Sequence, residues 1–384
     1  MMLKQSRTNK RDKCITICSL SNSSYFIDKN HQITGGSERQ IKYIVDALSK
    51  NGTKVQVLVT NATNIDRANS KNLTFKNLWY SHNNFIYKIF KLTKILSATN
   101  SHIYMRGLSW AHLYIILVSR ILNRKVILAM TSDVQCVKNP SPLINLMRMW
   151  SCRMTSLLLS QTNKQKMLLR DNFGANSFVY NNLISSTYLN KSYQTNNPFQ
   201  LRDIDALWMG AIEPRKGVSY LIDIAKRMPD KKITIVGNGR DEFKNFELEM
   251  LSQFNELPNV SVLGFIQPDL VGAIISSSKV LLNTSPVLYK GVTKEGFPNV
   301  FLEAWLFGTP VVSLFHDPDG LIKDNNLGRI CNDIQLFYDS VNELSLNQDL
   351  WDEISEQCQK WVKGRDVYFK NVRDDLGDIL FSDE

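Results

Sequence analysis

Two series of apolar runs and amphipathic segments follow one another along the 384-residue chain. In the first series, apolar runs at 13–20 and 54–60 flank residues 37–52, whose apolar positions recur with helical spacing. A strand–helix–strand unit of this kind predicts a parallel sheet, because two parallel strands need a long crossover connection. Further strands of this sheet are expected at 126–132 and 157–162.

The second series predicts another parallel sheet. Its expected strands are residues 204–212, 232–237, 259–265, 279–285 and 309–315. We therefore predict an α/β protein with two Rossmann-like parallel-sheet domains and an interdomain cleft at the carboxyl ends of their strands, where open sheets bind ligands. The predicted divisions are a polar tail at 1–12, a first domain at 13–190, a linker at 191–203, a second domain at 204–365, and a C-terminal helix at 366–384 that packs back on the first domain.

The two halves of the chain carry opposite net charge. Residues 1–200 contain 27 Lys and Arg against 7 Asp and Glu, whereas residues 201–384 contain 19 against 29. A basic half points to an anionic partner, such as nucleic acid, anionic lipid or a phosphorylated substrate, unless it is only a soluble basic surface. Aromatic residues are not interleaved with the cations as a nucleic-acid platform requires, so no nucleic-acid partner is expected.

Cysteine spacing and the length of the apolar runs bear on location. The six cysteines include no C-x-x-C pair, which argues against zinc and thioredoxin-like sites and is typical of core residues in a reducing compartment. The first dozen residues lack the apolar region of a secretory signal, and the longest apolar run, at 108–118, is too short to span a bilayer. We expect a cytoplasmic protein and consider peripheral contact with the cytoplasmic face of the membrane.

Three loops are candidate phosphate sites. Gly36, in a Gly-Gly pair, precedes a helix start, where free N–H groups and the helix dipole attract anions, although such a pair also serves as a plain tight turn. Arg215 and Lys216 follow the first strand of the second domain, and adjacent cations suit a diphosphate unless they form a solvated charge pair. Gly237 and Gly239 form a G-x-G that is a weak dinucleotide signal but allows a nucleotide to approach the backbone.

The segment EGFPNVFLEAWLFGTPVV, at 295–312, places two acids around a helix start. Gly296 allows the backbone to approach a ligand closely, and Pro298 suits the first helical turn, whose free N–H groups then face the cleft. Two carboxylates beside a phosphate site make sense as acceptors of hydrogen bonds from sugar hydroxyls, Glu303 from a ribose and Glu295 from a hexose. An acid that favours the helix dipole would explain Glu295 alone.

These residues resemble a known family. KEGFPNVFLEA, at 294–304, is similar to the E-x7-E signature of family 4 retaining glycosyltransferases, which have the GT-B fold. The resemblance extends over nearly the whole chain, since residues 34–59 resemble the first glycine loop and helix of that family, and residues 210–239 resemble the opening of its donor domain. It implies a retaining enzyme that moves a sugar from a nucleotide-diphosphate donor, bound by the second domain, to an acceptor bound by the first.

The resemblance also implies roles for individual residues. Lys216, with Arg215 nearby, would neutralise the donor diphosphate; Glu303 would bind the ribose and Glu295 the transferred hexose. The backbone around that hexose would belong to Gly296, Phe297, Pro298 and Asn299. The nucleobase end of the donor site would be shaped by Gly237, Gly239 and Phe265, and Gly36 would approach the phosphates from the first domain.

Two positions depart from the family pattern. Many relatives have an Arg directly after the glycine that ends the first donor-domain strand, whereas here Gly210 is followed by Ala211, which removes one expected phosphate ligand. Many also have a His in a central loop of the first domain, near the acceptor. The matching loop reads TSD, so Asp133 is the candidate catalytic residue there, with acceptor orientation or a structural role as its two interpretations.

The expected chemistry retains the anomeric configuration and needs no cofactor besides the UDP- or GDP-linked donor. The protein positions the reactants and stabilises charge on the leaving diphosphate. Cations and helix N-termini supply that charge, so a metal is not expected to be required. The D-x-D sequences at 203–205 and 317–319 have metal-clamp spacing, but the first ends the predicted linker and the second is interpreted as a loop near the site.

The basic first domain is the acceptor side under this interpretation. Residues 85–96, FIYKIFKLTKIL, mix apolar and basic residues as helices on anionic lipid do, although the same apolar face would also pack on a sheet. We expect a glycan or lipid-linked acceptor in cell-surface polysaccharide biosynthesis. The alternatives are another GT-B enzyme, such as a sugar-nucleotide epimerase or phosphorylase, and a non-catalytic nucleotide- or nucleic-acid-binding module.

Overall fold

The computed structural model describes residues 14–22, 35–50, 52–61, 69–80, 82–98, 101–184, 197–287 and 295–381, with the backbone alone at 21–22 and 365–381. The predicted tail at 1–12, Lys294 and the first part of the predicted linker lie outside these residues.

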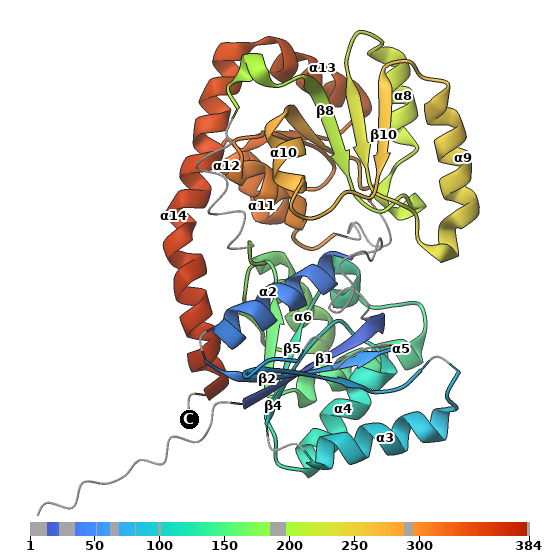
Figure 1. Ribbon diagram of the computed structural model, residues 1–384, viewed down its shortest axis with the longest axis vertical. Coiled ribbons are helices and arrows are strands. Elements are labelled where there is room, and N and C mark those ends of the chain that lie inside the picture. Colours follow the sequence, from blue (N-terminus) through green and yellow to red (C-terminus); the bar gives the residue numbers. More distant parts are fainter. Residues whose placement is uncertain are drawn as a thin grey trace, which may run out of the picture.

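The first domain is built on a parallel sheet with the strand order β3-β2-β1-β4-β5-β6-β7 (Figure 1). Its strands are β1 (Cys14–Asn22), β2 (Lys54–Thr60), β3 (Leu73–Asn77), β4 (His102–Arg106), β5 (Val126–Ala129), β6 (Leu157–Ser160) and β7 (Phe178–Val179). Its helices are α2 (Gly36–Lys50), α3 (Phe85–Ala98), α4 (Trp110–Ile121), α5 (Pro142–Met154) and α6 (Asn163–Phe173).

The second domain repeats this plan with the strand order β10-β9-β8-β11-β12-β13. Its strands are β8 (Ile204–Met209), β9 (Ile233–Val236), β10 (Val260–Gly264), β11 (Ser278–Asn283), β12 (Val311–Leu314) and β13 (Gly328–Cys331). Its helices are α8 (Tyr220–Arg227), α9 (Lys244–Asn255), α10 (Val271–Ser276), α11 (Asn299–Leu306), α12 (Leu321–Asp324), α13 (Ile334–Leu346) and α14 (Gln348–Phe381).

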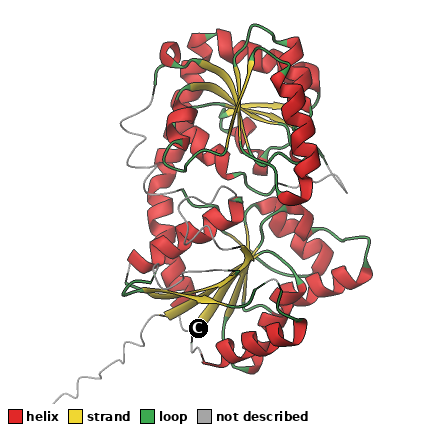
Figure 2. Ribbon diagram, turned by 45° about the vertical axis from the view of Figure 1, so that its right-hand side comes forward, coloured by secondary structure: helices red, strands yellow, loops and turns green. Residues whose placement is uncertain are grey.

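Continuous apolar runs explain why these strands lie inside the domains. Every residue of β5, β9 and β12 is buried, as expected for parallel strands covered by helices on both faces of the sheet. Figure 2 shows each sheet enclosed in this way. The strands β3, β7 and β13, which the sequence did not predict, all lie at sheet edges, where a short and partly exposed strand gives a weak apolar signal.

The order of the strands fixes where ligands bind. In the first sheet β1 lies between β2 and β4, and in the second β8 lies between β9 and β11. Successive connections therefore leave these central strands in opposite directions, which opens a crevice at their carboxyl ends. Two such crevices, one from each domain, supply the walls of the site described below.

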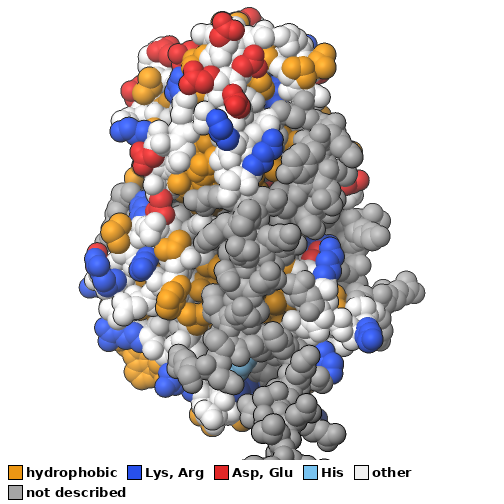
Figure 3. Space-filling model, turned by 90° about the vertical axis from the view of Figure 1, so that its left-hand side faces the viewer, with side chains coloured by type: hydrophobic (Ala, Val, Ile, Leu, Met, Phe, Trp, Pro, Cys, Tyr) orange, Lys and Arg blue, Asp and Glu red, His pale blue; other side chains and the backbone are white. Residues whose placement is uncertain are grey.

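The long helix α14 joins the two domains along one side of the molecule (Figure 1). Its first half packs on α11, where Trp305 and Trp361 meet with ring centroids 5.1 Å apart, and it also contacts α2 of the first domain. Residues 366–381 are not a separate helix, because they continue α14 from Gln348. On the face drawn in Figure 3, acidic side chains gather over the second domain, whereas Lys and Arg predominate over the first.

Candidate functional site

A cavity of about 500 Å³ lies between the two domains. Its lining includes the last residues of strands, loop residues that follow them, and the starts of α2 and α11, so it occupies the crevices at the carboxyl ends of both sheets. The first domain contributes residues 35–39 and Arg106, Thr131, Ser132, Gln135, Gln161 and Asn182. The second domain contributes, among others, residues 209–211, 236–238, 265–266 and 295–300, together with Glu213 and Lys216.

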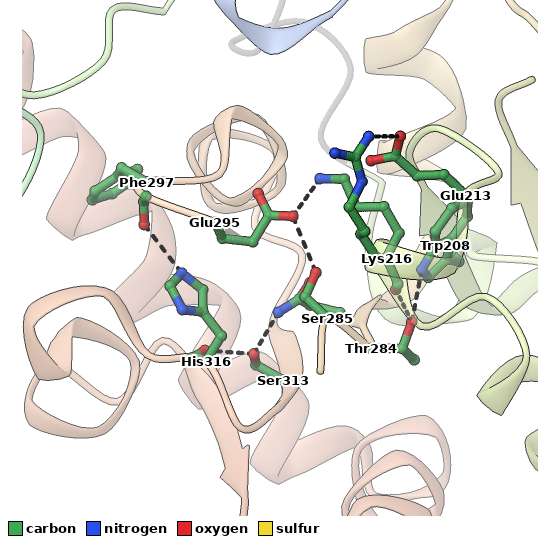
Figure 4. A network of polar contacts seen from close by, with 12 residues as sticks. Trp208, Glu213, Lys216, Thr284, Ser285, Glu295, Phe297, Ser313 and His316 are labelled. Atoms are coloured by element: carbon green, nitrogen blue, oxygen red, sulfur yellow. Dashed lines mark hydrogen bonds and ion pairs between the residues drawn. The ribbon is translucent and has the colours of Figure 1, made fainter. Parts of the chain in front are cut away.

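Lys216 reaches this cavity from a short 3-10 turn after β8 (Figure 4). The turn ends at Gly217, whose φ of +65° is strained for residues with a side chain. Thr284 fixes the turn, because its hydroxyl donates to the Lys216 carbonyl at 2.9 Å and accepts from the Trp208 indole at 3.1 Å. The backbone of Lys216 is thus anchored while its side chain is left to reach across the cavity.

The ammonium of Lys216 forms an ion pair with the carboxylate of Glu295. The Ser285 hydroxyl donates to the same carboxylate at 3.1 Å. Burial alone would raise the pKa of Glu295, but the Lys216 ammonium and these hydrogen bonds hold that pKa below its usual value. Glu295 is therefore ionised at neutral pH, and the pair presents a fixed cation and a fixed anion to any ligand.

Arg215, which the sequence placed beside Lys216 at the diphosphate, points elsewhere. Its guanidinium donates to Glu213 at 3.0 Å and to Glu242 at 3.3 Å, and it lies over the ring of Phe243. It is not among the residues that line the cavity. Adjacent residues in a tight turn project in different directions, so only one of the two predicted cations faces the site.

Side-chain amides of the first domain bind the backbone of residues 296–299. The Phe297 N–H donates to the Gln161 side chain at 3.1 Å, and the Asn182 side chain donates to the Phe297 carbonyl at 2.7 Å. The side chain of Asn299 accepts from Asn182 and from Gln40 and donates to the Gly36 carbonyl. No local sequence pattern points to these amides, because their partners lie more than 100 residues away.

Two predicted glycines are required by close approach. A Cβ at Gly296 would overlap the Gln161 side chain, and a Cβ at Gly237, which has a φ of +134°, would overlap the Gly210 carbonyl. Both residues line the cavity, as do Gly36, Phe265 and Ala211. Gly239 does not line it; its N–H instead donates to Glu247 at 2.7 Å. Pro298 occupies the N-cap position of α11, one residue before the first turn in which it was predicted.

Glu303, the predicted ribose ligand, pairs with Arg39 of the first domain at 3.0 Å. Its side chain is 3 % exposed and lies outside the cavity lining. The pair connects α11 to the first turn of α2, so it crosses the domain interface. A ribose that binds Glu303 has to share this carboxylate with Arg39 or displace the guanidinium.

Asp133 is buried beside the site rather than in it. Its carboxylate pairs with Lys164 at 3.0 Å and accepts from Gln165 at 3.1 Å, while its N–H donates to the Glu295 carbonyl. Burial raises the pKa of Asp133 above its usual value, although Lys164 and Gln165 act in the opposite direction. The neighbours that line the cavity are Thr131 and Ser132, so these contacts favour the structural interpretation of Asp133.

Three aspartates of the two D-x-D sequences, Asp205, Asp317 and Asp319, have protein partners. Asp317 accepts from the N–H groups of Ile322 and Lys323, and Asp319 accepts from those of Asn163 and Lys164, at the start of α6 in the other domain. Asp205 pairs with Lys279 at 2.7 Å. In the described ranges, no three His, Cys, Asp or Glu side chains come together in a way that fits a metal ion.

A stretch that includes most of the second domain matches a known protein family. Residues 203–347 match the family described as glycosyl transferases group 1. An uncharacterized glycosyltransferase of Haemophilus influenzae is 26 % identical over 214 residues, or 53 % of this chain and 55 % of that protein. The match thus spans about half the length of this relative.

Solved structures share the whole two-domain arrangement. HepE from Anabaena, solved in complex with UDP-glucose, is 16 % identical with a TM-score of 0.69, over 94 % of this chain and 98 % of HepE. A glycosyltransferase from Rickettsia africae is 14 % identical with a TM-score of 0.73, over 97 % of this chain and 100 % of that protein. The predicted GT-B fold is confirmed. No helix in the described part of the chain has both the length and the apolar character of a bilayer span.

We predict that His316 makes the fold sensitive to mild acid. Its Nε2 lies 3.1 Å from the Gly296 carbonyl, and burial lowers its pKa to about 4. Between the unfolded pKa of about 6.5 and the folded value, only the unfolded chain binds the proton, so the free energy of unfolding falls as pH falls, by on the order of 3 kcal/mol in total. Urea unfolding at several values between pH 7 and pH 4 should show a shallower slope for His316→Gln; an equal slope contradicts the assignment.

We further predict that Arg39 and Glu303 are energetically coupled across the interface. Removal of one partner leaves a buried charge, so a double-mutant cycle of Arg39→Met and Glu303→Gln should give a coupling of about 1–3 kcal/mol in the free energy of unfolding. The exposed pair Arg170–Asp171 is the matched control, for which we expect less than about 1 kcal/mol. Additive effects at Arg39 and Glu303 would show that the contact contributes nothing.

Proposed function

We propose that this protein is a retaining glycosyltransferase that moves a hexose from a UDP- or GDP-linked donor to a glycan or lipid-linked acceptor, in cell-surface polysaccharide biosynthesis. The observation that carries the proposal is the Lys216–Glu295 pair, which faces the cavity beside the first turn of α11. A cation and free N–H groups suit a diphosphate, and a carboxylate suits sugar hydroxyls. The match of residues 203–347 to group 1 glycosyl transferases supports the same assignment.

In the proposed reaction, the donor diphosphate replaces Glu295 as the partner of Lys216. Glu295 then accepts hydrogen bonds from the hexose, while the backbone of residues 296–299 packs against it. The bond from the anomeric carbon to the phosphate oxygen breaks, and the acceptor oxygen bonds to that carbon on the same face. The acceptor proton passes to the leaving phosphate oxygen. Lys216 stabilises the charge that develops on the diphosphate, so the reaction as proposed has no metal-dependent step.

Substitution of Lys216 tests the donor site directly. A charge-assisted hydrogen bond is worth roughly 1.5–3 kcal/mol, so Lys216→Ala should weaken UDP or GDP binding by roughly 10- to 100-fold in calorimetric titrations. Arg215→Ala is the matched control, because the Arg215 side chain does not line the cavity and pairs with Glu213 and Glu242, and we expect a change of less than about threefold. Equal losses in both variants, or none in Lys216→Ala, would exclude the proposed donor site.

We also propose that the first domain lies on anionic membrane through α3. Phe85, Ile86 and Phe90 are 75 %, 78 % and 64 % exposed, whereas Leu92 and Leu96 are buried. The interpretation that the apolar face packs on the sheet therefore accounts for the second half of the helix only. Lys94 is exposed on the same helix, which lies at the end of the first domain far from the second (Figure 1). Exposed aromatic and basic residues together are typical of helices at lipid surfaces.

Vesicle sedimentation checks the membrane proposal. The protein should sediment with phosphatidylglycerol-containing vesicles and less with phosphatidylcholine alone, and salt should weaken the binding. Phe85→Ser/Phe90→Ser should lose most of the binding because two buried aromatic contacts with lipid are removed. Leu248→Ser/Leu336→Ser, at exposed apolar positions of the second domain, is the control and should bind normally. Sedimentation that is unaffected by the α3 substitutions would remove α3 from the proposal.

A further inference from the structure

Arg106 is a buried cation in the wall of the cavity that the first domain supplies. It is the last residue of β4, at the point where the strand order of the first sheet reverses, and it is 8 % exposed. Its guanidinium donates to the Tyr104 hydroxyl at 3.4 Å and to the Asn182 side chain at 3.1 Å. Its Nε is buried and donates to no acceptor of the described chain.

Among the described residues, no carboxylate forms an ion pair with this guanidinium. The acids that line the cavity are Glu38, Glu213 and Glu295, of which Glu213 pairs with Arg215 and Glu295 with Lys216. Arg106 makes no ion pair with any described residue, in contrast to Arg39 and Lys216 in the same cavity. A buried guanidinium without a counter-charge is costly, because desolvation is not repaid by an opposite charge. An anion that enters the cavity would supply the missing charge.

The surroundings of Arg106 place such an anion on the acceptor side. Asn182 connects the guanidinium to the Phe297 carbonyl, which belongs to the segment proposed to surround the hexose. Only the Asn182 side chain therefore separates Arg106 from the proposed position of the hexose. Arg106 belongs to the first domain, whereas Lys216 belongs to the second. The first-domain residues that line the same cavity, Thr131, Ser132 and Gln135, carry neutral polar groups that suit sugar hydroxyls.

We infer that Arg106 binds an oxyanion of the acceptor, so that the acceptor is a sugar or sugar lipid carrying a phosphate or a carboxylate next to the attacking hydroxyl. This inference rests on the proposed function, because it assigns the first-domain wall to the acceptor. A guanidinium recognises phosphate and carboxylate through the same planar pair of N–H donors. Arg106 therefore selects a negatively charged acceptor, and titration with a phosphorylated and a carboxylated sugar distinguishes the two possible anions.

The test uses three small sugars on the whole protein saturated with UDP, namely glucose, glucose 6-phosphate and glucuronate. Calorimetric titration should show that at least one anionic sugar binds ten or more times more tightly than glucose, as expected for a charge-assisted hydrogen bond. Tighter binding of glucose 6-phosphate points to a phosphorylated acceptor, whereas tighter binding of glucuronate points to an acidic sugar. Equal affinity for all three, or no detectable binding of either anion, overturns the inference.

Three variants assign the preference to Arg106. Arg106→Gln should abolish the preference for anions and leave UDP affinity within about twofold, because UDP is held from the second domain. Arg106→Lys keeps the charge and should retain part of the preference. Arg170→Gln, at an exposed arginine of the same domain, is the control and should behave as the parent protein.

Two outcomes distinguish binding of an acceptor anion by Arg106 from a role of Arg106 in positioning Asn182 or in binding the donor. If Arg106→Gln and Arg106→Lys weaken UDP and the sugars alike, Arg106 only positions Asn182 or binds the donor, and the inference is wrong. If the parent protein binds neither UDP nor GDP, the proposed function fails on its own, and the three titrations are repeated without nucleotide. A preference for anions that still depends on Arg106 would then support an oxyanion site without a donor site beside it.

Discussion

The site depends on the backbone of residues 296–299 being hydrogen-bonded from the other domain. Gln161 and Asn182 bind the N–H and the carbonyl of Phe297, and Asn299 reaches back to Gly36. Amide side chains suit this task because each offers donors and an acceptor at once. Gly296 is required for the same reason, since a side chain there would overlap Gln161. The shape of the cavity is thus a property of the closed pair of domains rather than of either domain.

Charges extend this coupling between the domains. Glu303 of α11 meets Arg39 of α2, and Asp319 accepts from the first N–H groups of α6, where the helix dipole favours an anion. In both contacts an acid of the negative second domain meets a positive group of the first. The pair Lys216–Glu295, by contrast, lies within the second domain. A diphosphate can replace Glu295 beside Lys216 without breaking an interdomain contact, whereas a ribose at Glu303 disturbs one.

The sequence predicted the parts of this protein that depend on local pattern. Apolar runs identified the central strands except β4, and the position of Lys216 after β8 placed it in the cavity. The orientation of Arg215 away from the cavity could not be predicted, because the direction of a side chain in a one-turn segment is not encoded by residue type. The amides Gln40 and Asn182 were missed because their partner Asn299 lies 259 and 117 residues away, and contacts of that range leave no periodic signal.

The basic character of the first half has two physically distinct components. Most Lys and Arg side chains in the described part of the first domain are exposed or half-buried, as Figure 3 shows for one face. Such charges act at a distance that salt shortens to about 8 Å at physiological ionic strength. Arg106 is instead enclosed, and its interaction with a bound anion is screened far less. Attraction of the protein to an anionic surface should therefore fade with salt, while selection of an anionic ligand inside the cavity should persist. The two effects, which overall charge cannot separate, follow from where each cation sits in the fold.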